Sequence, residues 1–396
     1  MKKKLLKYII FTILLFLLLL LTACWDRKEL DDLAVVAGIA IDYDQETEGI
    51  KLTAQIIKAG EVGQPQGGGE GGSSAKEEGA ETVWVVESTG ETLFDAVRNF
   101  TFQSSRKLYF PHNNIIVFSK ELAEKGITPY LSFFIRDHET RNMVWVLIAE
   151  DQAGDVMRVK TDLEEIPAVG IARMIEDRVA TSEISGVMLQ EFLTMLISKT
   201  TDPVATPLRI LEKAGEKKPL IEGTAVFKGD KLLTHLNTKE TRGLLWVKGE
   251  VESGIIVIKD PRDNKISLEI TKASSKVKAE ITNGEYKIKL KVSTEGNIGE
   301  QMGVTNLATG KMIAYLERQK QEAVKREIEA ALKKAKEYKT DIFAFGEAFH
   351  RKYPNNWQEI KRDWDNIFPE IKVSIEVDSL LHHAGLNLKP PIPVKK

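Results

Sequence analysis

Residues 33–58, LAVVAGIAIDYDQETEGIKLTAQIIK, contain two apolar runs separated by a polar segment. The first run, residues 33–43, is rich in β-branched side chains and predicts a buried strand. The second run, residues 50–58, predicts another strand, and the polar residues 44–49 predict a turn between them. The folded part of the chain is therefore expected to open with a β-hairpin.

Beyond this hairpin, segments with the pattern of strands alternate with segments that have the period of helices. Strands are predicted over residues 82–88, 114–118 and 143–149. Helices are predicted over residues 92–104, 121–134 (with a break at Pro129) and 166–198. This alternation indicates an α+β domain over residues 24–200.

The composition changes after residue 200. Residues 201–219 contain three prolines and lysine-rich turns, so a linker is expected there. A second domain is expected over residues 220–396, with a subdivision near residue 295 as an alternative. It opens with short predicted strands over residues 221–227, 231–236, 254–258, 266–271, 276–281 and 286–293. Between the last two strands, Asn283-Gly284 is typical of a type I′ hairpin turn.

The second half also contains the longest predicted helix, residues 311–338, whose apolar stripe is interrupted by Lys320. Shorter helical stretches over 342–353 and 357–368 lead to a last predicted strand, 371–377. The expected fold class is α+β and multi-domain, with mixed, mostly antiparallel sheets and packed helices that include this long amphipathic one.

One predicted strand alternates buried and basic residues. Ile288, Leu290 and Val292 alternate with three lysines, so one face should be buried and the other basic; the lysines are Lys287, Lys289 and Lys291. The basic face is interpreted as a solvated strand edge, with an anion site as the alternative.

The N-terminus has the three parts of an export signal. A lysine-rich start precedes an apolar run over residues 8–21, which is too short to span a bilayer and fits the h-region of a signal peptide. Leu21, Thr22, Ala23 and Cys24 then resemble the lipobox of bacterial lipoproteins. Residues 1–23 are therefore predicted to be removed, leaving an acylated Cys24 (palmitate being an expected acyl chain) as a membrane anchor. An ordinary signal peptide with a chance cysteine, or a short membrane anchor, is the alternative.

Composition excludes several classes of protein. With a formal net charge of -2, the chain lacks the broad positive field that nucleic-acid-binding proteins use. A single cysteine among 396 residues excludes an internal disulfide framework and a Cys-rich metal cluster. Residues 60–79 contain eight glycines without a phosphate-loop pattern, and are expected to be a flexible insert.

No catalytic constellation is found in the sequence, so the chain is expected not to be an enzyme and to need no cofactor or metal. His382 and His383 are adjacent, but neighbours on a strand point to opposite faces. The acids from Asp42 to Glu48 lack the glycine and glutamate of a calcium loop and are interpreted as a hairpin turn. The charges over residues 136–141 are interpreted as structural ion pairs.

Several motifs resemble one known family. Residues 24–30 (CWDRKEL), which lead into 33–42, resemble the mature N-terminus of the Ger(x)C family, the C subunits of nutrient germinant receptors in endospore-forming bacteria. The other matching segments are 88–96 (STGETLFDA), 110–118 (FPHNNIIVF), 136–141 (RDHETR), 341–347 (DIFAFGE), Trp357, Trp364 and Gly385. Ala344 stands where the family pattern has a glycine.

The resemblance implies a lipoprotein on the outer face of the spore inner membrane. It also implies a non-catalytic role beside two membrane-embedded partners, the A and B subunits, in the response of spores to nutrients. Near the anchor, Trp25, Arg27 and Lys28 are candidates for contact with lipid headgroups or a partner, or they merely link the anchor to the fold. The competing hypotheses are a solute-binding lipoprotein, which would have two doubly wound lobes, and an anchored hydrolase.

Overall fold

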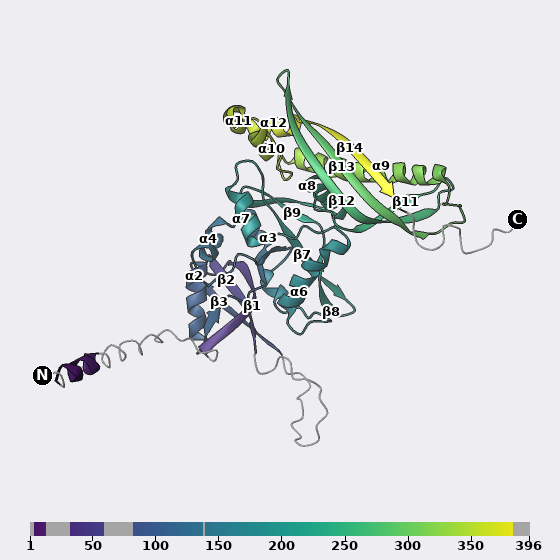
Figure 1. Ribbon diagram of the computed structural model, residues 1–396. Helices are drawn as coiled ribbons and strands as arrows, with labels where there is room; N and C mark the ends of the chain where they lie inside the picture. Colours follow the sequence, from purple (N-terminus) through teal and green to yellow (C-terminus); the bar gives the residue numbers. More distant parts are fainter. Residues whose placement is uncertain (1–3, 13–31, 59–81, 138, 383–396) are drawn as a thin grey trace.

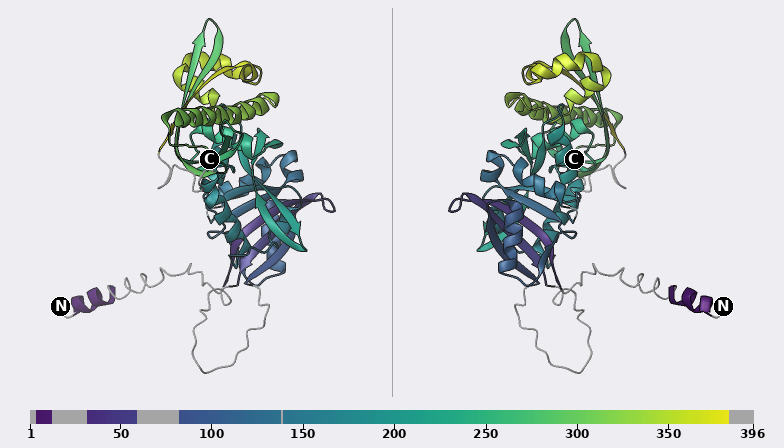
Figure 2. Two further views of the ribbon diagram at one scale, coloured as in Figure 1. Left: turned by 90° about the vertical axis from the view of Figure 1, so that its right-hand side faces the viewer. Right: turned by 90° about the vertical axis from the view of Figure 1, so that its left-hand side faces the viewer.

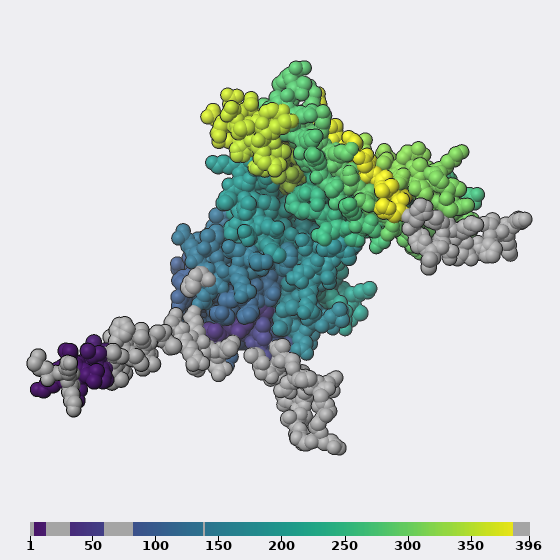
Figure 3. Space-filling model, in the orientation of Figure 1, coloured from purple at the N-terminus to yellow at the C-terminus, as the bar shows by residue number. Residues whose placement is uncertain are grey.

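The structure is a computed structural model that describes residues 4–12, 32–58, 82–137 and 139–382 (Figure 1). Its strands form two sheets, one with ten strands and one with four. The two halves of the chain pack directly against each other, as the space-filling view shows (Figure 3). Residues 4–12, within the expected signal peptide, are helical.

The larger sheet is built around four neighbouring parallel strands. β1 pairs with β5, β5 with β6 and β6 with β7, all in parallel. The full order is β10-β9-β7-β6-β5-β1-β2-β3, with β4 beside β1 and β8 beside β7. The strands are β1 (Leu33–Asp44), β2 (Gly49–Ile57), β3 (Val83–Gly90), β4 (Lys107–Tyr109), β5 (Ile115–Ser119), β6 (Trp145–Ala149), β7 (Val204–Lys213), β8 (Glu216–Ile221), β9 (Thr224–Lys228) and β10 (Lys231–Leu236). The predicted opening hairpin is confirmed, because β1 and β2 pair antiparallel.

Helices cover both faces of this sheet. Apolar residues of α2, α3, α4 and α7 pack on one face, and those of α5 and α6 pack on the other. The helices are α2 (Leu93–Asn99), α3 (Lys120–Lys125), α4 (Thr128–Arg136), α5 (Ala153–Val156), α6 (Pro167–Glu176) and α7 (Leu189–Ile197), with short 3-10 turns η2 (Phe100–Phe102) and η3 (Asp177–Ala180). Pro129 lies in the first turn of α4, so it begins a helix after the break.

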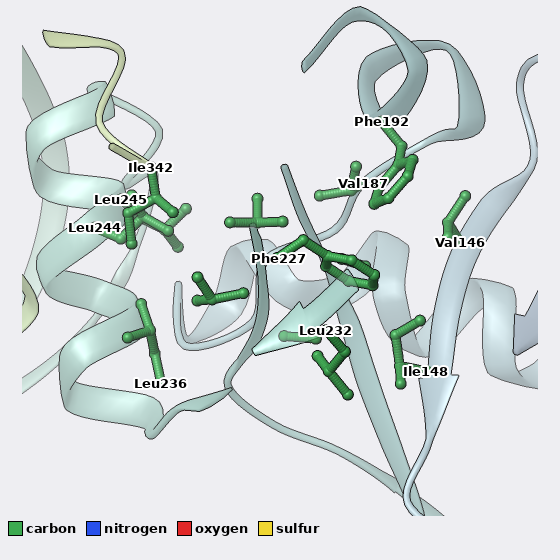
Figure 4. Close-up of a cluster of buried hydrophobic side chains, with 14 of the residues drawn as sticks. Val146, Ile148, Val187, Phe192, Phe227, Leu232, Leu236, Leu244, Leu245 and Ile342 are labelled. Carbon is green, nitrogen blue, oxygen red and sulfur yellow. The ribbon is translucent and has the colours of Figure 1, made fainter. Parts of the chain in front are cut away.

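Successive residues of the central strands enter different cores. Ile115 and Val117 of β5 face α5 and α6, while Ile116 and Phe118 face the other helices. The core that contains Ile116 and Phe118 continues into the other half of the chain. There Leu244 and Leu245 pack near Ile342 (Figure 4). The two halves therefore share one apolar interior.

The prediction of a linker over residues 201–219 is wrong at the level of secondary structure. β7 and β8 occupy this segment, and the sheet continues through β9 and β10 to Leu236, beyond the expected start of the second domain. Prolines marked a linker in the sequence, but Pro219 lies in the edge strand β8, where a missing N–H is tolerated. The solute-binding alternative expected two doubly wound lobes, whereas only the larger sheet has a parallel centre.

The smaller sheet has the order β11-β12-β13-β14, and only its last pair is parallel. Its strands are β11 (Gly254–Lys259), β12 (Lys265–Thr282), β13 (Glu285–Gln301) and β14 (Lys372–Leu381). The helices of this half are α8 (Thr238–Lys248), α9 (Gly310–Glu337), α10 (Phe345–Lys352), α11 (Pro354–Ile360) and α12 (Trp364–Glu370), with the 3-10 turn η4 (Lys361–Asp363). The fold class is α+β with two mixed sheets, as predicted.

Hairpin β12–β13 projects from one end of the molecule, opposite the end where β1 begins (Figure 2). Its turn has the two positive φ angles of a type I′ turn, 52° at Asn283 and 78° at Gly284, which confirms the predicted hairpin. Two strands were expected over residues 266–281, but β12 is continuous, and β13 passes through residue 295, where a subdivision was predicted.

Helix α8 was not predicted from the sequence. Asn237 and Glu240 form its capping box, and Gly249 ends it in the left-handed conformation. The capping box and the helix-ending glycine are both recognisable in the sequence, as N-x-x-E and a later glycine. The predicted long helix is confirmed as α9.

Candidate functional site

The site begins with Asp341, the first residue of the DIFAFGE run. Its buried carboxylate accepts backbone N–H groups from Gly346 at 2.7 Å, Phe345 at 3.1 Å and Phe343 at 3.3 Å. These donors lie in the first turn of α10 or just before it, where helices have no internal acceptors. Burial raises the pKa of Asp341 to about 7, against the opposing effect of the N–H groups.

Two small residues allow the turn around Asp341. Ala344 has φ of 59° and ψ of 35°, a left-handed conformation that favours glycine. A glycine, which the resemblance leads us to expect at this position, would adopt this conformation without strain. A Cβ on Gly346 would lie 2.7 Å from the carbonyl oxygen of Thr200 and 3.0 Å from the ring of Trp357, so this position must stay small.

Asp341 also pairs with Asp202, which lies between α7 and β7 in the first half of the chain. The N–H of Asp202 donates to the carbonyl of Asp341 at 2.9 Å, and the N–H of Asp341 donates to the carboxylate of Asp202 at 2.8 Å. This reciprocal pair joins the two halves of the chain. Burial raises the pKa of Asp202, while the nearby ammonium of Lys228 acts to lower it.

Lys228, at the end of β9, completes the network. Its ammonium donates to Asp365 at 2.7 Å, to the carbonyl of Lys339 at 2.9 Å and to Asp202 at 3.1 Å. Burial acts to lower the pKa of Lys228, but its hydrogen bonds to the two carboxylates outweigh that effect and raise it. One cation therefore connects the larger sheet with the end of α9 and with α12.

A cavity of about 360 Å³ lies beside this network. Its lining includes the network residues together with Ser198, Lys199, Thr200, Arg362 and Asn366. Charges of both signs line it, so the cavity is suited to water or a small polar molecule rather than to an apolar one. No histidine or cysteine is among the described residues that line it, so this lining does not contain a nucleophile paired with a histidine base.

A second buried contact joins the halves about α8. Arg242 donates to Glu183 at 3.0 Å and to both carboxylate oxygens of Glu327 on α9. The indole N–H of Trp246 donates to Glu327 at 2.9 Å. A Cβ on Gly243 would lie 2.1 Å from the carbonyl oxygen of Glu327, so this glycine lets α8 and α9 cross closely.

Comparison with known proteins identifies the chain. Residues 26–210 match the family described as the spore germination protein N-terminal domain, and residues 222–385 match the family described as spore germination B3/GerAC like, C-terminal. This chain belongs to the GerAC family. The gap between the two matches falls on the β7–β8 hairpin.

Relatives in Bacillus subtilis (strain 168) match along almost their whole length. The chain is 28% identical to spore germination protein KC, with 97% of each chain covered. It is 26% identical to spore germination protein B3, over 95% of this chain and 97% of that one. A crystal structure of the GerBC protein matches with a TM-score of 0.55 at 22% identity, covering 90% of this chain and 99% of that chain, which supports the fold.

In this GerAC-family chain, the predicted lipidation site lies outside the described residues. That is so for Leu21, Thr22, Ala23 and Cys24, for the candidate contacts Trp25, Arg27 and Lys28, and for the glycine-rich insert 60–79. Among the described helices, none combines the length and the apolar character needed to span a bilayer.

The other residues considered in the sequence have structural partners. Asp42 is buried and accepts the N–H groups of Ala153 and Gly154 at 2.7 and 2.8 Å, so it fixes α5 on β1. His382 contacts Glu295 at 2.7 Å, and His383 lies outside the described residues. Within the described ranges, no group of three or more His, Cys, Asp and Glu side chains is placed to hold a metal ion.

The basic strand is not an edge. β13 lies between β12 and β14, and its lysines pair with neighbouring acids. Lys289 contacts Glu280 at 2.9 Å, and Lys291 contacts Glu376 and Asp378, both at 2.8 Å. The paired charges do not favour the alternative of an anion site.

Sequence reasoning missed the junction residues Asp202, Lys228 and Arg242. Asp341 and Gly346 had a signal, because they belong to the DIFAFGE run. Asp202 had none, since an aspartate after a helix is commonplace in loops. Its partner Asp341 is 139 residues away, and no local pattern reports such a pairing.

Proposed function

We propose that this chain is the lipid-anchored, non-catalytic subunit of a nutrient germinant receptor, required for the germination response of endospores. The observation that carries the proposal is the match to spore germination proteins along 97% of both chains. A match of this extent aligns the whole architecture, including both family domains, with proteins named for germination.

Lipid anchoring of Cys24 is the second part of the proposal. The only cysteine of the chain follows Leu21-Thr22-Ala23 at the end of an apolar run. Two or more acyl chains hold a protein stably at a bilayer, whereas one chain binds only marginally. The protein would then lie on the outer face of the spore inner membrane, where A- and B-type membrane subunits are its proposed partners.

The network at the junction supports a scaffolding role. Asp202, Lys228, Asp341 and Arg242 all have partners inside the protein, and those partners join the halves of the chain. Charged groups used in this way hold a shape that partner subunits can recognise. They do not form the pair of nucleophile and base that a hydrolase requires.

The test compares the tagged wild-type chain with Cys24→Ala in spores. The wild-type protein is expected to incorporate labelled palmitate, to partition with membranes and to retain A- and B-type subunits in a pull-down. Cys24→Ala should lose the label and the membrane fraction, while Lys289→Ala, an exposed substitution on β13, should keep both. Pull-downs without A- or B-type subunits, or palmitate incorporation by Cys24→Ala, would contradict the proposal.

A further inference from the structure

The end of the larger sheet where the anchor segment enters has an unusual surface. β1 begins there at Leu33, β2 ends there at Ile57, and β3 begins there at Val83, because β2 pairs antiparallel with both of its neighbours. Lys58 and Thr82 continue this end, with the N–H of Lys58 donating to the carbonyl of Thr82 at 3.0 Å. The descending α2 leads toward the same end (Figure 1).

Two large apolar side chains flank this end and are almost fully exposed. Leu163 is 94% exposed and Phe102 is 85% exposed, the two highest values among the large apolar side chains that the structure describes. Leu163 lies in the loop whose Glu165 carbonyl accepts the hydroxyl of Thr82 at 2.7 Å. Phe102 ends η2, which follows α2 and whose Phe100 ring lies 5.7 Å from that of Trp84, the second residue of β3.

Basic side chains accompany the apolar ones. Lys107 pairs with Leu33 in the β1–β4 ladder, and Arg106 precedes it. Lys58, Arg106 and Lys107 are exposed, and within the described parts of the chain no ion pair links them to a carboxylate. Two of the acids beside Leu163 have basic partners, since Asp162 pairs with Lys218 and Glu164 pairs with Arg173, whereas Glu165 is exposed.

We infer that Lys58, Trp84, Phe102, Arg106, Lys107 and Leu163 form a membrane-docking surface, hereafter the anchor-side surface, that rests on an anionic bilayer. The inference depends on the proposed lipidation of Cys24. Eight residues lie between Cys24 and Leu33, so the nine Cα–Cα steps span at most about 30 Å even when fully extended. This short tether holds the anchor-side surface near the lipid headgroups.

The chemistry of the surface fits that location. Exposed aromatic and aliphatic side chains enter the boundary between headgroups and acyl chains, and cations there gain from anionic lipid. The surface would orient the protein, with hairpin β12–β13 directed away from the membrane (Figure 2). A lipid anchor alone sets distance but leaves the orientation free.

The single cysteine of the chain makes a direct test available. A lipidated Cys24 carries no free thiol, so the full-length wild-type protein should not react with a maleimide fluorophore. A cysteine introduced as Phe102→Cys, Leu163→Cys or Thr282→Cys then becomes the only labelling site. Thr282 is exposed and ends β12 at the hairpin tip, which makes it the matched control.

Each labelled full-length protein is reconstituted into vesicles of phosphatidylglycerol and phosphatidylethanolamine that contain lipids with a shallow quencher. Because interfacial side chains reach about 5–10 Å into the bilayer boundary, fluorescence at positions 102 and 163 should fall by about two-fold, and that at 282 should not change. Charge reversal by Arg106→Glu with Lys107→Glu should reduce the quenching in these vesicles but not in neutral phosphatidylcholine vesicles.

The outcomes separate the inference from the proposed function. Proteins that float with the vesicles but show no quenching at 102 and 163 would overturn the docking surface and leave the anchor intact. Loss of flotation, or maleimide labelling of the wild-type Cys24, would overturn both. Quenching that requires A- or B-type subunits in the vesicles would identify the surface as a protein interface and overturn the membrane assignment.

Discussion

The two sheets differ in how many of their faces are buried. In the larger sheet, all five residues of β5 and all five of β6 are buried, because helices cover both faces. In the smaller sheet, buried and exposed residues alternate along β11, and hairpin β12–β13 turns its lysines to solvent. A strand covered on both sides must be apolar throughout, whereas a strand covered on one side needs an apolar residue only at every second position.

The difference also determines where charge is tolerated. Outward lysines of the smaller sheet keep their hydration and pair with acids at little cost, because the pairs remain exposed. Arg242 is buried and has hydrogen bonds to two carboxylates, and the half-buried Lys228 has three acceptors. Several hydrogen bonds therefore offset the desolvation of the charges at this junction.

Shortening a central side chain of the larger sheet should have the largest effect. Phe118 of β5 is fully buried, so Phe118→Ala is expected to lower the free energy of unfolding by about 3–5 kcal/mol. The measurement is urea denaturation followed by circular dichroism. Lys289→Ala on the solvent face of β13 is the matched control and should leave the midpoint unchanged. Equal losses would refute the distinction between the sheets.

Removing the carboxylate between the sheets should come next. Asp341→Ala leaves three backbone N–H groups without their acceptor in a buried turn. Since an unsatisfied buried donor costs about 1–3 kcal/mol, we expect a loss of at least about 3 kcal/mol. Asp341→Asn retains one oxygen acceptor and should lose clearly less in the same denaturation experiment. If both variants unfold at the same midpoint, the hydrogen bonds are not the source of the effect.

Replacing Lys320 tests the cost of a charged side chain that is buried against the smaller sheet. Its side chain is fully buried against that sheet, its ammonium donates to the carbonyl of Glu295 at 3.1 Å, and burial lowers its pKa to about 8. Replacing a buried charge by an apolar group of similar volume often stabilises a protein, so Lys320→Met should gain about 1–3 kcal/mol at pH 7.

The sign of the pH dependence follows from the lowered pKa of Lys320. Between pH 8 and the ordinary lysine pKa of 10.5, the unfolded chain binds more protons at this residue than the folded chain does. Wild-type stability therefore rises with pH in this window, by at most about 1.4 kcal/mol per pH unit, and the advantage of Lys320→Met shrinks. Lys333→Met, at an exposed position of α9, serves as the control. If the stability difference between Lys320→Met and the wild type stayed constant from pH 7 to 10.5, the lowered pKa of Lys320 would be contradicted.

The smallest predicted effect concerns Ala344. Ala344→Gly removes the strain of the left-handed backbone but makes the unfolded chain more flexible. The first effect should be the larger, so the free energy of unfolding is expected to rise by about 0.5 kcal/mol. Ala348→Gly, inside the neighbouring α10, should instead lose about 1 kcal/mol. Thermal denaturation of the two variants side by side decides the point, and a loss of stability for Ala344→Gly would show that the turn is not strained.

Sequence reasoning succeeded where a signal lies within one element. The hairpin turn at Asn283-Gly284, the long helix α9 and the strand alternation at Ile288, Leu290 and Val292 are all read from adjacent residues. It failed at the segment 201–219, where prolines indicated a linker although two strands form. The strand assignment there depends on pairing with β6 and β9, which the local sequence does not encode.

The sequence by itself determined the fold class, the main hairpins, the family and the predicted anchor at Cys24, because each depends on neighbouring residues or on motifs in a fixed order. Only the tertiary structure decided the order of the strands, the burial of Lys320 and the pairing of Asp202 with Asp341. It also placed Phe102 and Leu163 at one end of the sheet. These features arise from contacts between distant segments, whose free energy depends on the packing of the whole chain and leaves no periodic trace along it.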